Sequence, residues 1–252
     1  MKKILIAAAI GAISFSAYQS VAQTWKDVAN GILNGYKTNT KTGSGTSINS
    51  LSNNDIVAAL RQALEIGAKN AGGRLGTVNG FFGNALIKVL MPPEAQKAES
   101  ALRSFGFGQV VDKAILSMNR AAEDASGKAA PIFINAIKTM NIQDGINILK
   151  GGNGAATSYL RNTTTGALTQ AFRPVIQSSL SKVGATAYWG DAMKIYNGLP
   201  TTRSKINPDL TAYVTERALN GLFVSIADEE TKIRNNPAAR VTDLLSKVFG
   251  AK

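Results

Sequence analysis

The segment VVDKAILSMNRAAEDAS, residues 110–126, is the most regular stretch of the chain and indicates its fold class. Its apolar residues recur every three or four positions, which is the spacing that places them on one face of an α-helix. Gly127 follows directly, and glycine is a common signal for the end of a helix. Segments that alternate apolar and polar residues, as half-buried strands do, are scarce in the rest of the sequence. This pattern predicts an all-α protein.

The same order of signals recurs along the chain from residue 51 onward. An Asn, Ser, Asp or Pro residue opens an apolar stripe of helical period, and Gly or Pro closes it. One short apolar piece is expected at 81–91, and the longest helix is expected to begin at Pro208 and end near Arg234. Three further pieces, separated by a run of Thr and a proline, are expected at 155–161, 165–172 and 174–183. We therefore expect a compact, irregular array of about ten short to medium helices.

The first 22 residues have the pattern of a cleaved secretory signal peptide. Lys2 and Lys3 form a positive start, and an uncharged, mostly apolar run of about a dozen residues follows them. That run is too short for a membrane-spanning helix, which needs roughly 20 apolar residues. Ser20 and Ala22 supply the small side chains of a cleavage site, so the mature chain is expected to start at Gln23. We expect a protein without a transmembrane anchor after cleavage, located in the periplasm or secreted.

The remainder of the chain divides into a short N-terminal segment and a larger helical part. Residues 23–50 begin with a short amphipathic stretch and continue as a linker rich in Thr, Ser, Asn and Gly. A length of about 230 residues after cleavage allows one large domain or two small ones. We expect a single all-helical domain at 51–252, with 1–22 as the signal peptide and 23–50 as the linker region.

The chain contains neither histidine nor cysteine, and this excludes several kinds of site. A Ser-His-Asp triad, a Cys-His pair, zinc sites made of imidazole or thiolate, and haem ligation through either residue are all ruled out. An enzyme with this composition would need carboxylates, a Ser-Lys pair or a metal bound through oxygen. The composition therefore disfavours an enzyme, and no catalytic residue, metal site or cofactor is predicted.

The positive charge of the chain fits an anionic partner, and it equally fits a basic protein whose charge only keeps it soluble. Loss of Lys2 and Lys3 with the signal peptide leaves 26 basic against 16 acidic residues, a formal charge of +10. The basic residues are spread out rather than clustered, and no nucleic-acid-binding motif is present, so nucleic acid is not an expected partner. In an export compartment the anionic partners are lipid headgroups, lipopolysaccharide and cell-wall polymers.

Two glutamates are expected on the apolar faces of helices. Glu123 lies beside Asn119 at the edge of the apolar face of 110–126, with Arg120 close to it, and Glu230 lies among apolar residues of the long C-terminal helix. A carboxylate in such a position is costly unless it is paired. We therefore predict one or two buried polar networks, which either line a ligand pocket, supply an acid for catalysis or only fix the packing of helices. The candidate residues are Asn119, Arg120, Glu123, Tyr159, Arg173, Glu230 and Arg234.

Several short motifs, taken in order, resemble one protein family. They are Asn119-Arg120-Ala121-Ala122-Glu123, Ala155-Ala156-Thr157-Ser158-Tyr159, Phe172-Arg173-Pro174, Asp209-Leu210-Thr211-Ala212-Tyr213-Val214, Glu229-Glu230 with Ile233, Arg234, Asn236 and Pro237, and the closing Phe249-Gly250. The series is similar to the bacterial exported proteins called domain of unknown function 4197, and it covers roughly 51–250. The resemblance implies an exported, helical, single-domain protein and carries over no catalytic role.

These observations give one main expectation for function and two alternatives. The main one is a binding or structural role at the cell envelope, with a basic surface directed toward an anionic envelope component. The first alternative is a carboxylate-dependent enzyme that cleaves cell-wall glycans, which needs an open groove with one glutamate of raised pKa. The second is a carrier of apolar small molecules, which needs a closed cavity lined by apolar side chains.

Overall fold

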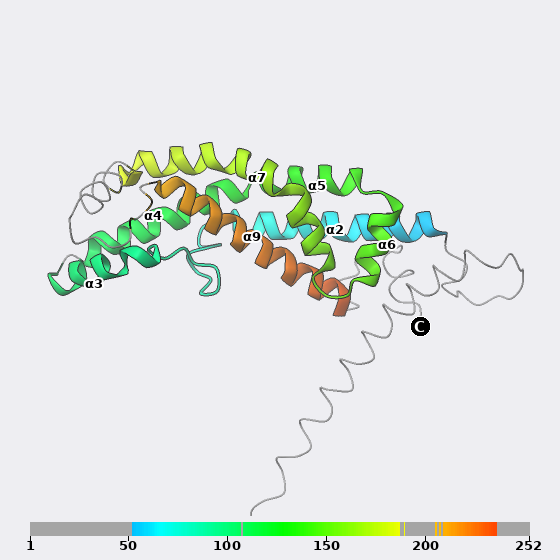
Figure 1. Cartoon of the computed structure of the whole chain (residues 1–252), viewed down its shortest axis with the longest axis horizontal. Helices are drawn as coiled ribbons and strands as arrows, with labels where there is room; N and C mark the ends of the chain where they lie inside the picture. The colour runs from blue at the N-terminus through cyan, green and yellow to red at the C-terminus, as the bar shows by residue number, and fades with distance from the viewer. Residues whose placement is uncertain are drawn as a thin grey trace, which may run out of the picture. The chain divides into compact units, whose positions relative to one another are not determined.

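The computed structural model describes residues 52–106, 108–186, 189, 205, 207 and 209–235. These residues form helices and turns without a strand, which confirms the all-α prediction (Figure 1). The elements, in chain order, are α2 (Asn53–Leu75), the short 3-10 helix η2 (Pro93–Ala95), α3 (Gln96–Ser104), α4 (Gly108–Ser126), α5 (Ala129–Thr139), α6 (Ile142–Lys150), α7 (Ala155–Lys182) and α9 (Leu210–Asn235). In this part of the chain no helix is long and apolar enough to cross a membrane.

Some expected segments lie outside the described residues. They are the signal peptide at 1–22 and the linker region at 23–50. Two further segments for which the sequence predicts helices, 237–248 and most of 185–199, also lie outside them. The division into a signal peptide, a linker and one domain therefore stays a prediction.

The prediction of about ten helices was too high for the described part of the chain, and α7 is one reason. The three expected pieces between residues 155 and 183 form one continuous helix that contains Pro174. Leu168, Phe172, Ile176 and Leu180 are all fully buried at a spacing of four, so one apolar stripe continues on both sides of the proline. The Thr run is accommodated within the helix, where the hydroxyls of Thr164 and Thr165 donate to the carbonyls of Leu160 and Arg161, four residues earlier.

The segment 81–91 is the second reason, because it folds as turns and extended chain instead of a helix. Asn79, just before it, has a φ of 69°, which ends helical geometry. Ile87 and Val89 are buried while Leu86 and Leu90 are exposed, so the side chains alternate between inside and outside as they do in a strand. Apolar character alone could not distinguish this alternation from a helix over so few residues.

Helix α2 continues past Gly72 and Gly73 to Leu75, although the sequence predicts a helix end at these glycines. A Cβ placed on Gly72 would lie 3.5 Å from the Ser126 carbonyl oxygen and 3.6 Å from the Ala130 backbone nitrogen. The absence of a side chain therefore lets the backbone of α2 approach the connection between α4 and α5 closely. At Gly72 the glycine is a packing feature inside the helix.

The described residues group into two compact units, which four helices connect. Unit 1 comprises the described parts of Met1–Ile66, Ile137–Tyr159 and Ala227–Lys252, and unit 2 comprises those of Gly67–Ala136 and Leu160–Ile226. Helices α2, α5, α7 and α9 each contribute residues to both.

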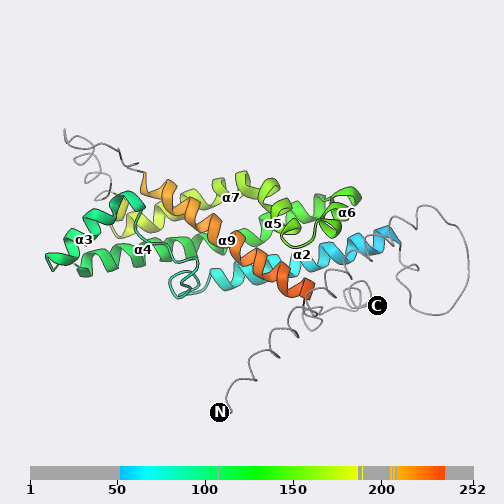
Figure 2. The same ribbon diagram turned by 60° about the horizontal axis from the view of Figure 1, so that its bottom comes forward.

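Each unit has buried apolar side chains of its own. In unit 1, Gly145 of α6 faces Val57 of α2 so closely that an added Cβ would lie 2.9 Å from a Val57 methyl group. In unit 2, the rings of Phe133 and Phe223 meet edge to face with centroids 5.9 Å apart. Helices α3 and α4 lie side by side within unit 2 (Figures 1 and 2).

Candidate functional site

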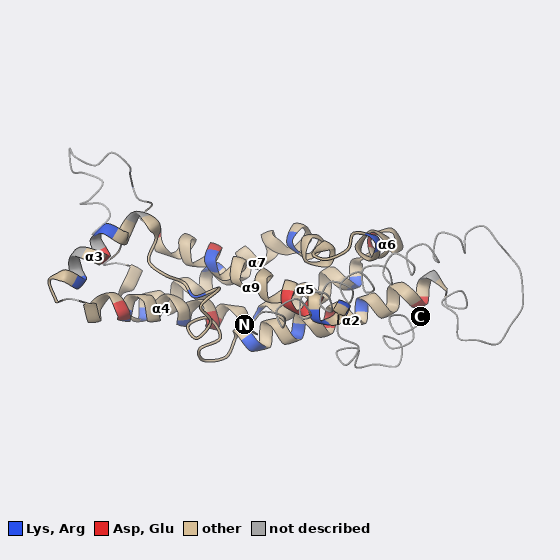
Figure 3. Ribbon diagram, turned by 90° about the horizontal axis from the view of Figure 1, so that it is seen from below, with Lys and Arg blue, Asp and Glu red and all other residues tan. Residues whose placement is uncertain are grey.

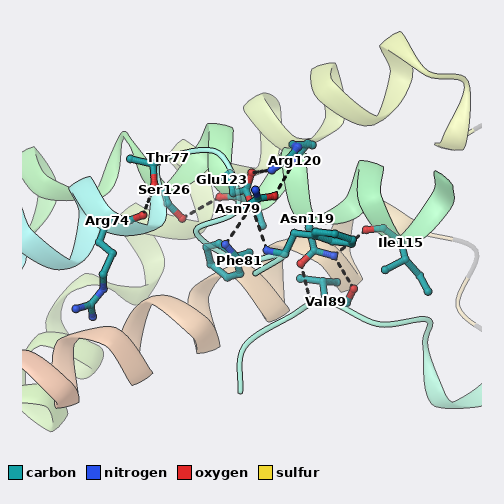
Figure 4. A network of polar contacts seen from close by, with 12 residues as sticks. Arg74, Thr77, Asn79, Phe81, Val89, Ile115, Asn119, Arg120, Glu123 and Ser126 are labelled. Carbon is teal, nitrogen blue, oxygen red and sulfur yellow. Dashed lines mark hydrogen bonds and ion pairs between the residues drawn. The ribbon is translucent and has the colours of Figure 1, made fainter. Parts of the chain in front are cut away.

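The first polar network lies in unit 2 and is centred on Glu123 of α4 (Figure 4). Its side chain is almost fully buried, with the residue 3% exposed. Oε1 accepts hydrogen bonds of 3.1 Å from the backbone N–H groups of both Phe81 and Phe82, and Oε2 accepts one of 2.5 Å from the Arg120 guanidinium. Arg120 also donates to the side-chain oxygen of Asn79 at 2.9 Å. The carboxylate therefore fixes the start of the non-helical segment that follows Asn79.

Asn119 fixes the same segment at a second point. Its side-chain oxygen accepts from the Val89 N–H at 2.9 Å, and its amide nitrogen donates to the Val89 carbonyl at 2.8 Å. The amide also donates to the Ile115 carbonyl one turn earlier in α4, at 2.7 Å. Both backbone groups of Val89 are thus paired with one side chain, as they would be with a neighbouring strand. Buried backbone groups need such partners, and α4 supplies them through its side chains.

Packing on the other side holds this segment in place. Phe81 is fully buried, and a Cβ on Gly221 of α9 would lie only 2.5 Å from its ring and 3.2 Å from Ile87. Gly221 therefore provides the space that the ring occupies. We call residues 76–91 the anchored loop, because α4 hydrogen-bonds it on one side and α9 packs against it on another.

The second network lies in unit 1 and is centred on Glu230 of α9. Its carboxylate accepts hydrogen bonds of 3.0 to 3.2 Å from the backbone N–H groups of Gly154, Ala156 and Thr157. It also accepts one of 2.7 Å from the Thr157 hydroxyl. These donors belong to the first turn of α7 and the residue before it. The first N–H groups of a helix have no partner within the helix, and its N-terminus favours negative charge. Glu230 therefore caps α7 from a helix that is more than 70 residues away in sequence.

Arg234 completes this network through a buried ion pair. Its guanidinium lies 2.8 Å from Glu230 Oε1 and donates to the Ile148 carbonyl at 3.1 Å, with both charged side chains at most 4% exposed. Burial lowers the pKa of Arg234 from its ordinary value, and the neighbouring Glu230 carboxylate opposes that effect. The pair joins the end of α6, the start of α7 and α9 within unit 1.

The comparisons with known proteins agree with the motifs in the sequence. The family model described as "Protein of unknown function (DUF4197)" matches residues 50–250. The chain belongs to this family. No curated protein and no solved structure matches it.

The short motifs of this DUF4197 chain contain most of the residues in the two networks. Asn119, Arg120 and Glu123 belong to the first motif, and Thr157 belongs to the second. Glu230 and Arg234 belong to the motif that begins at Glu229. The segments that carry the family resemblance therefore also carry the side chains that fix the anchored loop and the start of α7.

One of the predicted residues, Arg173, lies outside these networks. Arg173 is exposed and pairs with Asp209, which also caps α9 by accepting the Ala212 N–H at 2.9 Å. Tyr159 is half-buried, and burial raises the pKa of its hydroxyl with a further contribution from Asp144. The prediction that Arg173 joins a buried network was wrong, because its side chain is exposed and pairs with Asp209. Membership of Tyr159 in a network stays a prediction.

Thr157 and Asn79 belong to the networks but were not predicted as members. Thr157 lies at the start of a helix, where a hydroxyl beside free N–H groups is a recognisable signal. Asn79 precedes a glycine, and Asn-Gly is a turn signal that indicates positive φ. Within residues 52–106, 108–186 and 209–235, no group of three or more acidic side chains is arranged to hold a metal ion.

Proposed function

We propose that this chain is an exported helical protein that acts by binding at the cell envelope, without catalysis, and that its partner is anionic. The observation that carries the non-catalytic part of the proposal is the way in which Glu123 and Glu230 are paired within the chain. Each buried carboxylate accepts hydrogen bonds from backbone N–H groups and pairs with an arginine of its own chain. Their arrangement supports a role in holding the fold together.

This use of the two acids counts against the glycan-cleaving alternative. A catalytic acid must carry a proton and must reach the oxygen of a glycosidic bond. Glu123 and Glu230 are 3% and 6% exposed and accept hydrogen bonds instead of donating one. Neither is positioned to protonate a substrate.

The charge of the chain supports an anionic partner. The formal charge of +10 expected after signal cleavage leaves an excess of cations, and Figure 3 shows Lys and Arg distributed over several helices. Arg103, Arg120 and Arg234 pair with acids of the chain. A net positive surface attracts polyanions over a distance of about 10 Å at moderate salt, and that attraction weakens as salt rises.

The test is a binding experiment with the processed protein purified from a host that exports it. We expect sedimentation with phosphatidylglycerol vesicles, lipopolysaccharide or cell-wall sacculi, weak sedimentation with phosphatidylcholine vesicles, and a decline as sodium chloride is raised. N-terminal sequencing of the same sample should begin at Gln23. Binding to none of the three anionic components would refute the proposal. Lysis of sacculi that Glu123→Gln or Glu230→Gln abolishes, while the variant stays folded, would favour the enzyme instead.

A further inference from the structure

The anchored loop exposes apolar side chains while its other residues are held firmly in unit 2. Val78, Leu86 and Leu90 are 75%, 86% and 55% exposed. Single exposed apolar residues are common and need no explanation. Here three of them occur within the anchored loop, and Leu86 and Leu90 directly adjoin the buried residues Ile87 and Val89 in sequence. We call Leu86 and Leu90 the apolar surface of the loop.

The loop is too well fixed for these leucines to turn inward. Ile87 and Val89, the inward neighbours of Leu86 and Leu90, are buried, and both backbone groups of Val89 are held by Asn119. The Tyr213 hydroxyl of α9 donates to the Leu90 carbonyl at 3.0 Å. The stretch from Lys88 to Leu90 is extended and alternates its side chains, so fixing Val89 inward also turns Leu90 outward. Leu86 lies in the preceding turn, where the Ile87 and Lys88 N–H groups donate to the Asn84 carbonyl.

Three cations lie close to aromatic rings in the loop or beside it. Lys88 lies between the two leucines, and its ammonium group is 4.0 Å from the centre of the Phe82 ring. The Arg120 guanidinium is 6.0 Å from the same ring, and Arg217 lies 5.4 Å from the ring of Tyr213, which bonds the loop. Residues 76–92 contain no Asp or Glu. The loop thus combines exposed leucines with positive charge beside them.

We infer that the anchored loop docks on an anionic lipid surface, with Leu86 and Leu90 entering the boundary between headgroups and acyl chains. Lys88 and Arg217 then lie near the lipid phosphates. Apolar burial combined with attraction to anionic headgroups is how peripheral proteins bind membranes, and long basic side chains can place their apolar stems inside and their charges outside. This inference rests on the proposed function and narrows its partner to lipid.

The first experiment measures partitioning of the processed protein onto phosphatidylglycerol-containing vesicles. Leu86→Ala with Leu90→Ala is expected to weaken partitioning by roughly 10- to 100-fold, because several buried methylene groups are lost. Val110→Ala with Val183→Ala removes exposed apolar groups elsewhere and should leave partitioning unchanged. Lys88→Gln should weaken partitioning about fivefold at low salt. Lys113→Gln, at an exposed position of α4, should have a smaller effect.

The second experiment gives a positive signal for insertion. Relative to the wild type, whose Trp25 and Trp189 give the background signal, Leu86→Trp should add blue-shifted fluorescence that brominated lipids quench, and Val110→Trp should not. The leucines are exposed, so these variants are expected to fold, and circular dichroism checks that they do.

The outcomes separate this inference from the broader proposal. If the protein binds sacculi or lipopolysaccharide but not vesicles, or if the double leucine variant binds vesicles as tightly as the wild type, the loop assignment is overturned and the anionic partner stands. If the protein binds none of them, both fall. A third outcome is that the wild type forms a dimer and does not bind vesicles, and that the double leucine variant is a monomer. The loop is then an interface between two copies, and the lipid assignment is wrong.

Discussion

Replacing Glu230 by glutamine is the sharpest test of the buried network in unit 1. The carboxylate accepts three backbone N–H groups, the Thr157 hydroxyl and the Arg234 guanidinium. Glutamine has nearly the same size, but its NH2 group cannot accept a hydrogen bond and would face donors. It also leaves the Arg234 charge buried without its partner. Removing one member of a buried ion pair costs about 3 to 5 kcal/mol.

We expect Glu230→Gln to lower the free energy of unfolding by about 4 kcal/mol, which corresponds to a fall in Tm of about 8 to 16 °C for a chain of this size. Urea and thermal unfolding followed by circular dichroism measure both quantities. Glu216→Gln, on an exposed part of the same helix, should change the free energy by no more than about 0.5 kcal/mol.

A double variant identifies the cause of that loss. Adding Arg234→Met to Glu230→Gln removes the unpaired charge, so the double variant should lose less stability than the sum of the two single variants. Thr157→Val removes only one donor and should cost about 1 kcal/mol, which keeps the test usable if Glu230→Gln does not fold. A loss below about 1 kcal/mol for Glu230→Gln would refute the assignment of Glu230 as the cap of α7.

Three further predictions concern single contacts in unit 2. Asn119→Ala should lower the free energy of unfolding by about 3 kcal/mol and speed hydrogen exchange at the Val89 amide, because both backbone groups of that residue lose their partner. Gly221→Ala should cost about 1 to 3 kcal/mol in urea unfolding, because the added methyl group meets a buried ring. Asp209→Ala should cost about 1 kcal/mol at pH 7 through the lost helix cap. Burial raises the pKa of Asp209, but backbone N–H groups and Arg173 outweigh it and the net shift is downward from 3.8. Because the pKa of Asp209 is lower in the folded protein, its carboxylate stabilises the fold above pH 3.8, and this stabilisation is lost as the pH falls through the folded pKa. The difference in the free energy of unfolding between wild type and variant should therefore shrink below about pH 3.8.

The helical class and the position of the two glutamates could be predicted because both follow from local periodicity. Residues three and four apart share a face of a helix, so Glu123 and Glu230 could be placed among apolar neighbours before any partner was known. The same reasoning found the Glu230 and Arg234 pair, since its members are one turn apart. Local patterns therefore carried this part of the prediction.

The partners of these acids could not be predicted because they come from distant parts of the chain. Gly154 and Thr157 are more than 70 residues from Glu230, and the periodicity of α9 does not show which backbone groups will face it. Arg173 was misplaced for the same reason. Its pairing with Asp209 depends on how α7 and the start of α9 meet, and no single helical pattern contains that information.

The conformation of the segment 81–91 depends on side chains of α4 and could not be predicted from its own composition. A short apolar run satisfies its backbone groups internally only if it is a helix, and otherwise it needs outside partners. Asn119 and Glu123 provide such partners at Val89, Phe81 and Phe82, so the segment can fold without forming a helix. In an extended segment every second side chain points outward, and this is why an apolar run exposes its leucines. The buried acid and amide of α4 therefore determine the surface that the anchored loop presents.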